Sequence, residues 1–550
     1  MSMPADAPAD PVDPATGWRV GGGRSWYLLA LLTLTSAVSL LDRQILTILA
    51  VDIKRDLGLN DTEIGLLYGT VFAVFYSMFS LPLGRLADGW TRTRQISITL
   101  AAWSACTAAC AFVTGFASMA VARIGVAIGE AGSAPASSSL ISDVFPRRLR
   151  GTVFAISALA ATLGIAMSSV LGGVVVDSWN ASFPGGKGWF GLVGWQAAFI
   201  AASIPGFALA LLMIFIKEPP RGLADGISPP PVAHPFRRAA AELLALVPIV
   251  SQVHLRRIGG GRAGLINLAT LVAVVLVVIA AIAFATGASS AERLLVYAHV
   301  AGIAITSHVV QWSVVGFGAF ALLSWIQAQK ITDAPAARVM WGAPSFIALL
   351  VVAAGFNVII YGMMGWVAPF AVRTYGASLS DVGVRIGAMG LSAGIFGTLA
   401  GGWIADRARR VSPSGRIWVL LFAVAAPAPL AYMAFTSPTF DGWTFWFFAI
   451  SVALCPWLPC VLATLQDLVL PRMRGTATAL LYLCTTIFGM GTGPYLVGMM
   501  SDATGDLGGS ILRIYFFGPV IWIACLVIIR CIGRDEAGMV ERARLAGEPV

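Results

Sequence analysis

Four ionisable residues lie inside stretches that are otherwise apolar, and they are the first candidates for chemistry. Asp42 and Arg43 are adjacent in one stretch, and Arg123 and Glu130 lie seven positions apart in another. A charged side chain inside an apolar span is costly and usually marks an ion pathway or a proton relay. Seven positions keep Arg123 and Glu130 on one helix face, about 10 Å apart along the axis. The spacing indicates that these two side chains do not touch directly.

These four residues predict a proton switch. A carboxylate in a low dielectric beside a mobile arginine can take up a proton when that arginine moves away. We expect Asp42 and Glu130 to respond to protons, with Arg43 and Arg123 as their charge partners. The alternative is a permanently closed charge network that only fastens helices together.

The composition places these residues in an integral membrane protein. The chain has 550 residues, of which 58% are hydrophobic and only 11% charged, whereas about a quarter of the residues are charged in soluble domains. The net charge of +9 needs no nucleic-acid partner, because cytoplasmic loops of membrane proteins retain Lys and Arg. There is no phosphate-binding Gly-Lys-Ser/Thr loop and no hydrolase triad. We therefore expect no enzyme activity, no cofactor and no metal site.

Apolar stretches long enough to cross a bilayer, about 20 residues each, fall into two blocks. We expect an all-α fold of two six-helix bundles, at 26–216 and 343–532. The first block has its spans at 26–50, 64–83, 95–115, 118–142, 151–175 and 195–216. The second has them at 343–371, 381–404, 416–436, 442–470, 474–500 and 510–532.

Two pairs of matching loops indicate an internal duplication. The stretch from Gly84 to Arg94, with Asp88 and Arg92, repeats the pattern of the stretch from Gly402 to Arg410, with Asp406 and Arg407. The loop from Asp143 to Gly151 likewise matches the one from Asp467 to Gly475. Duplicated halves that face each other across a cavity are typical of parallel-repeat transporters. We interpret the Gly-Asp-Arg loops as gating elements; the alternative, topological signals alone, would explain the arginines but not the repeated Gly and Asp.

The distribution of Lys and Arg near the span ends predicts the orientation. Basic residues gather on one side of the predicted spans, which is the cytoplasmic side by the positive-inside rule. Both termini then lie in the cytoplasm, and we expect a multi-pass protein of the cell (inner) membrane. Residues 1–25 are predicted to be a disordered cytoplasmic tail, and residues 533–550 a second tail.

A long insert, roughly 217–342, separates the two blocks. It begins with a basic cytoplasmic segment and continues with apolar stretches at 265–287 and about 294–327. Because the second block starts on the side where the first one ends, the insert needs an even number of crossings. We predict two extra helices; the alternative is that both stretches lie in the interface, which leaves twelve spans.

Aromatic and polar residues of the second block are candidates for a substrate cavity. We expect its wall to contain Asn357, Tyr361, Trp366, Trp457 and Thr464, with Pro456, Pro459 and Pro494 bending helices nearby. Such a wall suits a substrate with a long apolar part. The alternative is that these aromatic residues face lipid or neighbouring helices.

The two blocks together resemble the Major Facilitator Superfamily, whose cytoplasmic signature looks like the Gly-Arg-Leu-Ala-Asp loop at 84–88. Within it, Leu41-Asp42-Arg43, Gly129-Glu130-Ala131 and Lys217-Glu218-Pro219-Pro220-Arg221 look most like Spinster-type transporters. The resemblance implies alternating access, often linked to protons, and in animal members the export of sphingosine phosphate or lysophospholipid. The fifth span lacks the Gly-Pro of the superfamily's antiporter pattern.

We therefore expect a monomeric secondary active transporter of an amphipathic or lipid-like solute. Its partners would be that substrate, protons and membrane lipids. Three alternatives stay open: a proton symporter of a small organic anion, a multidrug-type efflux transporter, and a lipid scramblase or sensor without a coupled cycle. In the symporter, Arg43 or Arg123 would bind the substrate carboxylate.

Overall fold

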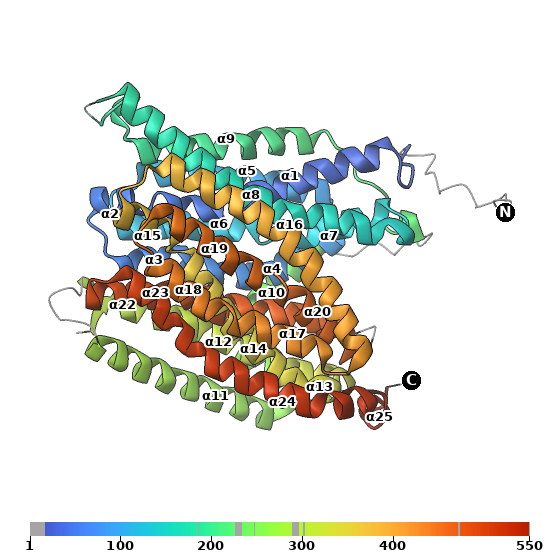
Figure 1. Ribbon diagram of the computed structural model, residues 1–550. Coiled ribbons are helices and arrows are strands. Elements are labelled where there is room, and N and C mark those ends of the chain that lie inside the picture. The colour runs from blue at the N-terminus through green and yellow to red at the C-terminus, as the bar shows by residue number, and fades with distance from the viewer. Residues whose placement is uncertain are drawn as a thin grey trace. The chain divides into compact units, whose positions relative to one another are not determined.

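The structure is a computed structural model, and it is almost entirely helical (Figure 1). It describes residues 17–184, 186–225, 234–246, 248–288, 296–300, 303–470 and 473–548. Residues 1–16 of the predicted tail, and Pro471 and Arg472 of the repeated loop, lie outside the described residues.

Internal contacts divide the chain into two compact units, each described by itself. The first unit comprises Met1–Leu46 and Phe79–Leu243. Its helices, some of which continue past these limits, are α1 (Gly23–Ile48), α4 (Thr70–Gly89), α5 (Arg92–Ala109), α6 (Phe116–Glu130), α7 (Ser133–Val144), α8 (Arg147–Ser182), α9 (Gly194–Ile214) and α10 (Pro235–Leu246), with short 3-10 turns η1 (Cys110–Phe112), η2 (Trp189–Gly191) and η3 (Leu223–Asp225).

The second unit comprises Thr47–Met78 and Leu244–Val550. It begins with α2 (Ala50–Leu57), α3 (Asp61–Tyr68) and the start of α4, and continues with α11 (Pro248–Ala288), strands β1 (Val296–Val300) and β2 (Ile303–Thr306), α12 (Ser307–Thr332) and α13 (Ala334–Trp341). The remaining elements are α14 (Pro344–Met364), α15 (Val367–Tyr375), α16 (Leu379–Val411), α17 (Gly415–Ala425), α18 (Pro427–Phe435), α19 (Phe440–Leu454), α20 (Trp457–Asp467), α21 (Arg474–Cys484), the π-helical turn η6 (Thr485–Met490), α22 (Gly493–Thr504), α23 (Leu507–Arg513), η7 (Ile514–Phe517), α24 (Gly518–Ala537) and α25 (Met539–Arg544).

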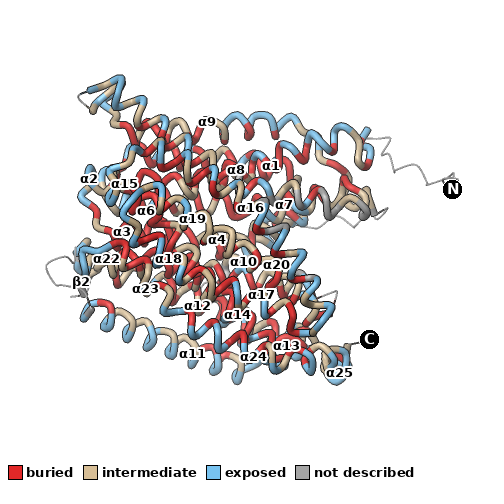
Figure 2. Tube along the Cα trace, in the orientation of Figure 1, coloured by how far each residue is buried: buried red, intermediate tan, exposed pale blue. Residues whose placement is uncertain are grey.

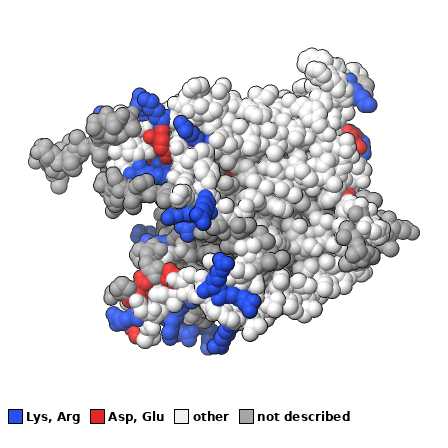
Figure 3. Space-filling model, turned by 180° about the vertical axis from the view of Figure 1, so that it is seen from behind, with Lys and Arg blue, Asp and Glu red and all other residues white. Residues whose placement is uncertain are grey.

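The apolar spans predicted from the sequence are helical. Among the described residues, twelve helical segments are long and apolar enough to cross a membrane. They include both insert helices, within Val250–Gly287 and Ser307–Thr332. The predicted spans 118–142 and 381–404 are not among the twelve: the first is divided into α6 and α7, and the second forms the 33-residue helix α16. Most of the surface in Figure 3 is uncharged, as expected of helices that face lipid.

Two of the predicted proline breaks are confirmed. Helix α19 ends at Leu454, and α20 begins directly after Pro456. Helix α22 begins at Gly493 with Pro494 in its first turn, after the π-helical turn η6. Proline lacks the N–H that continues a helix, so each break falls where the residue type predicts it.

The insert differs from its prediction at one place. Residues 296–300 and 303–306, expected to start an apolar span, form the antiparallel strands β1 and β2 with Val300 opposite Ile303. The β-branched and aromatic residues of this segment favour a strand over a helix.

Helix α11 is mostly exposed in Figure 2, and only 6% of its most apolar 18-residue stretch is buried. It packs on α12, and its path breaks at Gly260, whose φ of 73° suits only glycine.

The predicted tail at 1–25 is shorter than expected, because its last nine residues are folded. Trp18 and Val20 are only 3% and 2% exposed. The backbone N–H of Gly21 donates to the Val144 carbonyl at 2.9 Å, and α1 begins at Gly23. Burial of one large aromatic side chain stabilises this short segment. The sequence does not reveal it, because the Pro- and Ala-rich residues before it are typical of a disordered tail.

Glycines allow close helix packing at two places that position functional residues. In the first unit, a Cβ at Gly129 would lie 2.6 Å from Cβ of Trp103, so α6 approaches α5 closely beside Glu130. In the second unit, a Cβ at Gly65 would lie 2.4 Å from the Pro494 carbonyl oxygen, so α3 and α22 pack backbone to backbone. Small residues are the usual means of such approach in membranes.

Candidate functional site

The first unit contains the predicted intramembrane charge cluster. It consists of Asp42 and Arg43 on α1 together with Arg123 and Glu130 on α6, and we extend it to Ser39 on α1. The side chains of Asp42, Arg123 and Glu130 are fully buried. The structure therefore brings all four predicted residues to one place between α1 and α6.

Glu130 is the carboxylate of this cluster that has both an ion pair and a hydrogen bond. Nε of Arg43 lies 2.9 Å from its Oε2, and the Ser39 hydroxyl donates to the same oxygen at 2.7 Å. Glu130 is the last residue of α6, and the Ser133 hydroxyl donates to its carbonyl at 2.9 Å as the chain turns into α7. The helix break thus places an ion-paired glutamate where backbone groups are also free to bond.

Asp42 has a different environment. Nη1 of Arg123 donates to the backbone carbonyl of Asp42 at 2.9 Å, and not to its carboxylate. Among the described residues, neither side-chain oxygen of Asp42 has an ion pair or a well-formed hydrogen bond, although Thr107 and Trp103 of α5 lie close. The expected network is therefore formed for Arg43 and Glu130, while the Asp42 carboxylate is left without a cation in contact.

A second set of polar residues in the first unit surrounds Arg92, the first residue of α5. The Arg92 side chain is fully buried: Nε lies 2.7 Å from Oε1 of Glu218, and Nη1 contacts the carboxylate of Asp143. Arg221 donates to the carbonyls of Ala87 and Trp90, each at 2.7 Å. Burial and the nearby Arg92 charge lower the pKa of Arg221. The loop that follows α4 is thereby tied to the residues that follow α9.

The second unit repeats this arrangement with its own residues. Nη1 of Arg416 lies 2.6 Å from the carboxylate of Asp467, which is the duplicated counterpart of Asp143. Nη2 of Arg409 lies 2.7 Å from Glu536, which follows the last span as Glu218 follows the sixth. The internal duplication seen in the sequence therefore extends to the ion pairs.

The other predicted gating residues are less engaged. Asp88 is exposed, and Gly84 has only the Pro135 side chain near its Cβ position, at 3.8 Å. Arg407 is exposed with its guanidinium 5.9 Å from the Trp403 ring centroid. Gly402 has open space beside it, and the side chain of Asp406 lies outside what the structure describes. Among the predicted gating residues whose side chains the structure describes, Arg92 alone makes the kind of ion pair that was expected of this motif.

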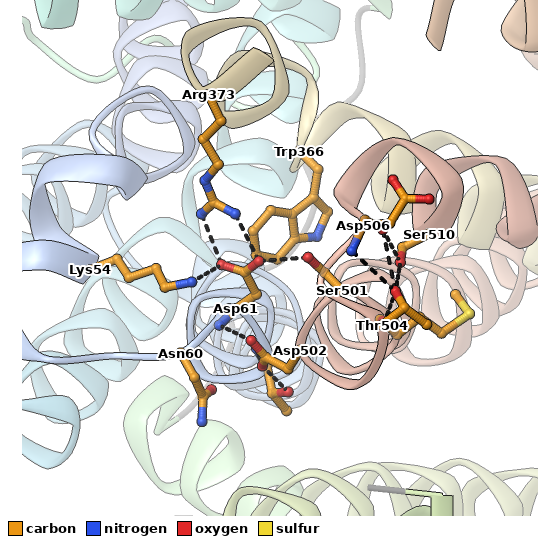
Figure 4. A network of polar contacts seen from close by, with 12 residues as sticks. Lys54, Asn60, Asp61, Trp366, Arg373, Ser501, Asp502, Thr504, Asp506 and Ser510 are labelled. Carbon is orange, nitrogen blue, oxygen red and sulfur yellow. Dashed lines mark hydrogen bonds and ion pairs between the residues drawn. The ribbon is translucent and has the colours of Figure 1, made fainter. Parts of the chain in front are cut away.

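The second unit contains a network that sequence reasoning missed. The Asp61 network consists of Lys54, Asp61, Thr62, Arg373, Ser501 and Asp502 (Figure 4). The Asp61 carboxylate receives Nη1 and Nη2 of Arg373, each at 2.8 Å, and Nζ of Lys54 at 2.7 Å. The Ser501 hydroxyl donates to it at 2.7 Å. Asp61 is only 2% exposed, so two cations compensate one buried anion.

Asp502 completes this network from α22. Its carboxylate accepts the backbone N–H groups of Asp61 and Thr62 at 3.0 and 2.6 Å, at the N-terminus of α3. The network thus joins α3 of the first six-span block to α15 and α22 of the second block. The sequence places Asp61 and Asp502 on the lightly charged side, but Arg373 is 312 positions from Asp61, and nothing in the local pattern pairs them.

The five predicted cavity residues are found in two kinds of environment. Trp366 is fully buried and donates Nε1 to the Pro494 carbonyl at 2.9 Å, and Thr464 is buried with its hydroxyl on the Cys460 carbonyl at 2.7 Å. Asn357 is 5% exposed and bonds the Ala353 carbonyl of its own helix. Trp457 and Tyr361 are partly exposed, Trp457 stacking on Phe356 at 5.1 Å. In this structure, Trp366 and Thr464 act as packing residues.

The family of this chain is identified by its similarity to known proteins. Residues 32–494 match the family profile described as Major Facilitator Superfamily. The chain belongs to the Major Facilitator Superfamily. As a member of this superfamily it is a multi-pass membrane transporter with a small-molecule substrate, and its fold is that of transporters and not of enzymes.

Its relatives within the Major Facilitator Superfamily fall into several groups. An MFS-type efflux pump of Mycolicibacterium smegmatis is 25% identical over 508 residues, which is 92% of this chain and 91% of the pump. Protein spinster of Drosophila melanogaster is 25% identical over 205 residues, 37% of this chain and 32% of that protein.

A solved structure of a bacterial homolog to the human lysosomal transporter Spinster, inward-facing and unoccupied, has the same fold. It aligns with a TM-score of 0.63 at 23% identity and covers 95% of each chain. The predicted fold class and the resemblance to Spinster-type transporters are therefore confirmed.

Proposed function

We propose that this superfamily member is a proton-coupled secondary active transporter of an amphipathic or lipid-like solute. The observation that carries the proposal is the intramembrane charge cluster, in which one buried carboxylate is ion-paired and a second is not. Asp42 and Glu130 exchange protons, and Arg43 and Arg123 respond to that exchange.

The coupling step follows from charge compensation. Leaving a buried charge uncompensated costs several kcal/mol, so an aspartate without a cation in contact is suited to bind a proton. Protonation of Glu130 would release Arg43 from its ion pair, and α1 could then move relative to α6. Proton binding would in this way change the packing of two helices that belong to the same unit.

The Asp61 network supplies the gate in this account. It joins α3 to α15 and α22 on the side that the distribution of basic residues assigns to the exterior. With this orientation in the cell membrane, both termini lie in the cytoplasm. Its contacts support a state closed to the exterior. Opening it requires the separation of Asp61 from Arg373 and Lys54.

The substrate class is supported by the chain's aromatic and apolar character and by the Spinster relatives. Tyr76 and Tyr361 lie close enough to Tyr482 to interact with it, and Tyr361 and Trp457 are partly exposed. Such residues offer apolar area with a polar edge, which suits a lysolipid or sphingolipid. Multidrug-type efflux is the second candidate, because the efflux pump of M. smegmatis matches nearly the whole length of the chain.

Uptake into proteoliposomes tests the proposal. A labelled lysolipid, a labelled organic acid and a labelled cationic drug are each offered with and without an imposed pH gradient. We expect lysolipid movement that follows the gradient. Movement of only the organic acid would favour a symporter, movement of only the drug would favour efflux, and lysolipid flux indifferent to the gradient would indicate scrambling.

A further inference from the structure

The insert between the two six-helix blocks contacts the place where α3 and α22 pack together. This seam is defined by Gly65 against Pro494 and by Gly498, whose Cβ position lies 2.3 Å from the Asp61 carbonyl oxygen. The Asp61 network closes one end of the seam. Two elements of the insert border the seam, the hairpin and α12. Helix α12 contacts both α3 and η6.

Gln311 of α12 bridges the two blocks. Its Nε2 donates to the Gly491 carbonyl at 2.8 Å, and its Oε1 accepts from the Thr70 hydroxyl. Thr70 begins α4 in the first block, whereas Gly491 lies between η6 and α22 in the second, two residues before α22 begins. Gln311 and Thr70 are both fully buried. Hydrogen bonds in such surroundings are directional and costly to leave unmade.

Tyr297 of β1 holds the other side of the seam. Its hydroxyl donates to Oε1 of Glu63, whose Oε2 accepts the backbone N–H of Asn60 in the capping box of α3. Burial and the negative charge of Glu63 raise the pKa of the Tyr297 hydroxyl, which therefore stays protonated and acts as the donor. The hairpin thus contacts the same turn of α3 that carries Asp61.

His308 attaches α12 to α22. Its Nδ1 lies 2.6 Å from the Tyr495 hydroxyl, and both side chains are buried. Trp312, one helical turn later, meets the Tyr495 ring edge-on at 6.1 Å. The opposite side of α12 faces α11, where Val309, Gly316 and Phe320 line a pocket together with apolar residues of α11. Helix α12 is therefore apolar toward α11 and polar toward the seam.

We propose that the insert is a clamp, in which Tyr297, His308 and Gln311 hold α3 to α22 and thereby favour the state in which the Asp61 network is formed. The proposal goes beyond the transport activity, because it assigns a role to a segment outside the two six-helix blocks. A helix that only covered lipid-facing surface would need no buried polar contacts to both blocks. The three side chains act as positioning residues, and none of them is assigned to the substrate or to protons.

Distance measurement between two spin labels tests the clamp. Labels are attached at Asp56→Cys on α2 and Ala503→Cys on α22, both exposed, after replacement of the seven native cysteines. Tyr297→Phe removes one hydroxyl, and Gln311→Met keeps the side chain's length while removing its hydrogen bonds. Ser313→Ala is the matched control, because Ser313 is exposed and lies two positions after Gln311 on the same helix.

We expect each seam variant to raise the ratio of long to short distances about threefold to tenfold, as the loss of one buried hydrogen bond would, and Ser313→Ala to leave it unchanged. The temperature of unfolding serves as the second readout. Unchanged ratios with a lowered unfolding temperature would reduce the insert to a structural support, and an equal rise in the control would show a nonspecific effect; either result overturns the clamp. Transport assays are not involved, so the result is independent of the proposed substrate and coupling.

Discussion

Two buried aspartates in this transporter, Asp42 and Asp61, have opposite surroundings. Asp42 is fully buried in the first unit without a cation in contact, and Asp61 is 2% exposed in the second unit with two cations and a serine on its carboxylate. Burial alone therefore does not assign a role to a carboxylate. The partners decide whether it can stay ionised as a lock or is suited to exchange a proton.

The elements that carry them explain the difference. Asp61 is the first residue of α3, and the groups on its carboxylate come from three other helices: Lys54 from α2, Arg373 from α15 and Ser501 from α22. Asp42 lies in the interior of α1, whose backbone groups are already paired, and Arg123 donates to its carbonyl instead. A helix end gathers partners, whereas a helix interior receives only what its neighbours supply.

The largest effect is expected from Arg43→Gln, which removes the cation that is ion-paired with Glu130. Glu130 would keep the Ser39 hydroxyl but lose its ion pair, so its proton could no longer be exchanged against Arg43. Gradient-driven accumulation should be lost while substrate binding is partly kept. Binding and uptake of a labelled lysolipid measure the two effects separately; loss of binding would instead support the organic-anion symporter.

Asp61→Ala should disrupt the Asp61 network, because it leaves Lys54 and Arg373 without their anion. Truncating the buried partner of such a pair should destabilise the closed arrangement by about 2–4 kcal/mol. The label pair on α2 and α22 should then report mainly long distances. An unchanged distance distribution would mean that the Asp61 network follows closure and does not stabilise it.

The two cations of the Asp61 network should differ in importance. Arg373 makes two hydrogen bonds to Asp61, and Lys54 makes one from a more exposed position. We expect Arg373→Gln to cost about 2 kcal/mol of closed-state stability and Lys54→Gln about 1 kcal/mol or less. The same distance measurement at low and high salt ranks them. Equal effects would show that net charge, and not the bidentate geometry, holds the gate.

The smallest effect is expected from Ser39→Ala, which removes one hydrogen bond to Glu130 while the ion pair stays. The change should amount to about 1–2 kcal/mol in the stability of the ionised pair. It should appear as a shift in the pH at which uptake is half-maximal, with little loss of maximal rate. Thr35→Ala on the same helix is the control, because Thr35 bonds only the Leu31 carbonyl of α1.

The sequence predicts the spans, the duplication and the first cluster because these depend on local patterns. Apolar runs define the helices, matched loops reveal the repeat, and charges in apolar spans stand out against their neighbours. The duplication even pairs Asp143 with Asp467, which the structure shows in equivalent ion pairs with Arg92 and Arg416.

The Asp61 network and the insert's contacts are not predictable in this way. Asp61, Arg373 and Asp502 come from separate helices, and each alone is an ordinary charge at a helix end. The strands at 296–300 and 303–306 and the folded residues 17–25 were missed because short segments carry little periodicity. The carbonyl contact of Arg123 was missed because backbone acceptors carry no sequence signature.

Exchange and gradient-driven uptake, compared in proteoliposomes for Asp42→Asn and Asp61→Asn, test whether the first aspartate binds the coupling proton and the second holds the gate. Asp42→Asn removes the proton-binding carboxylate but no ion pair, so it should abolish gradient-driven uptake while substrate exchange across the membrane continues. Asp61→Asn weakens the gate, so it should alter exchange and uptake together. Gradient-driven uptake that survives in Asp42→Asn would contradict the account.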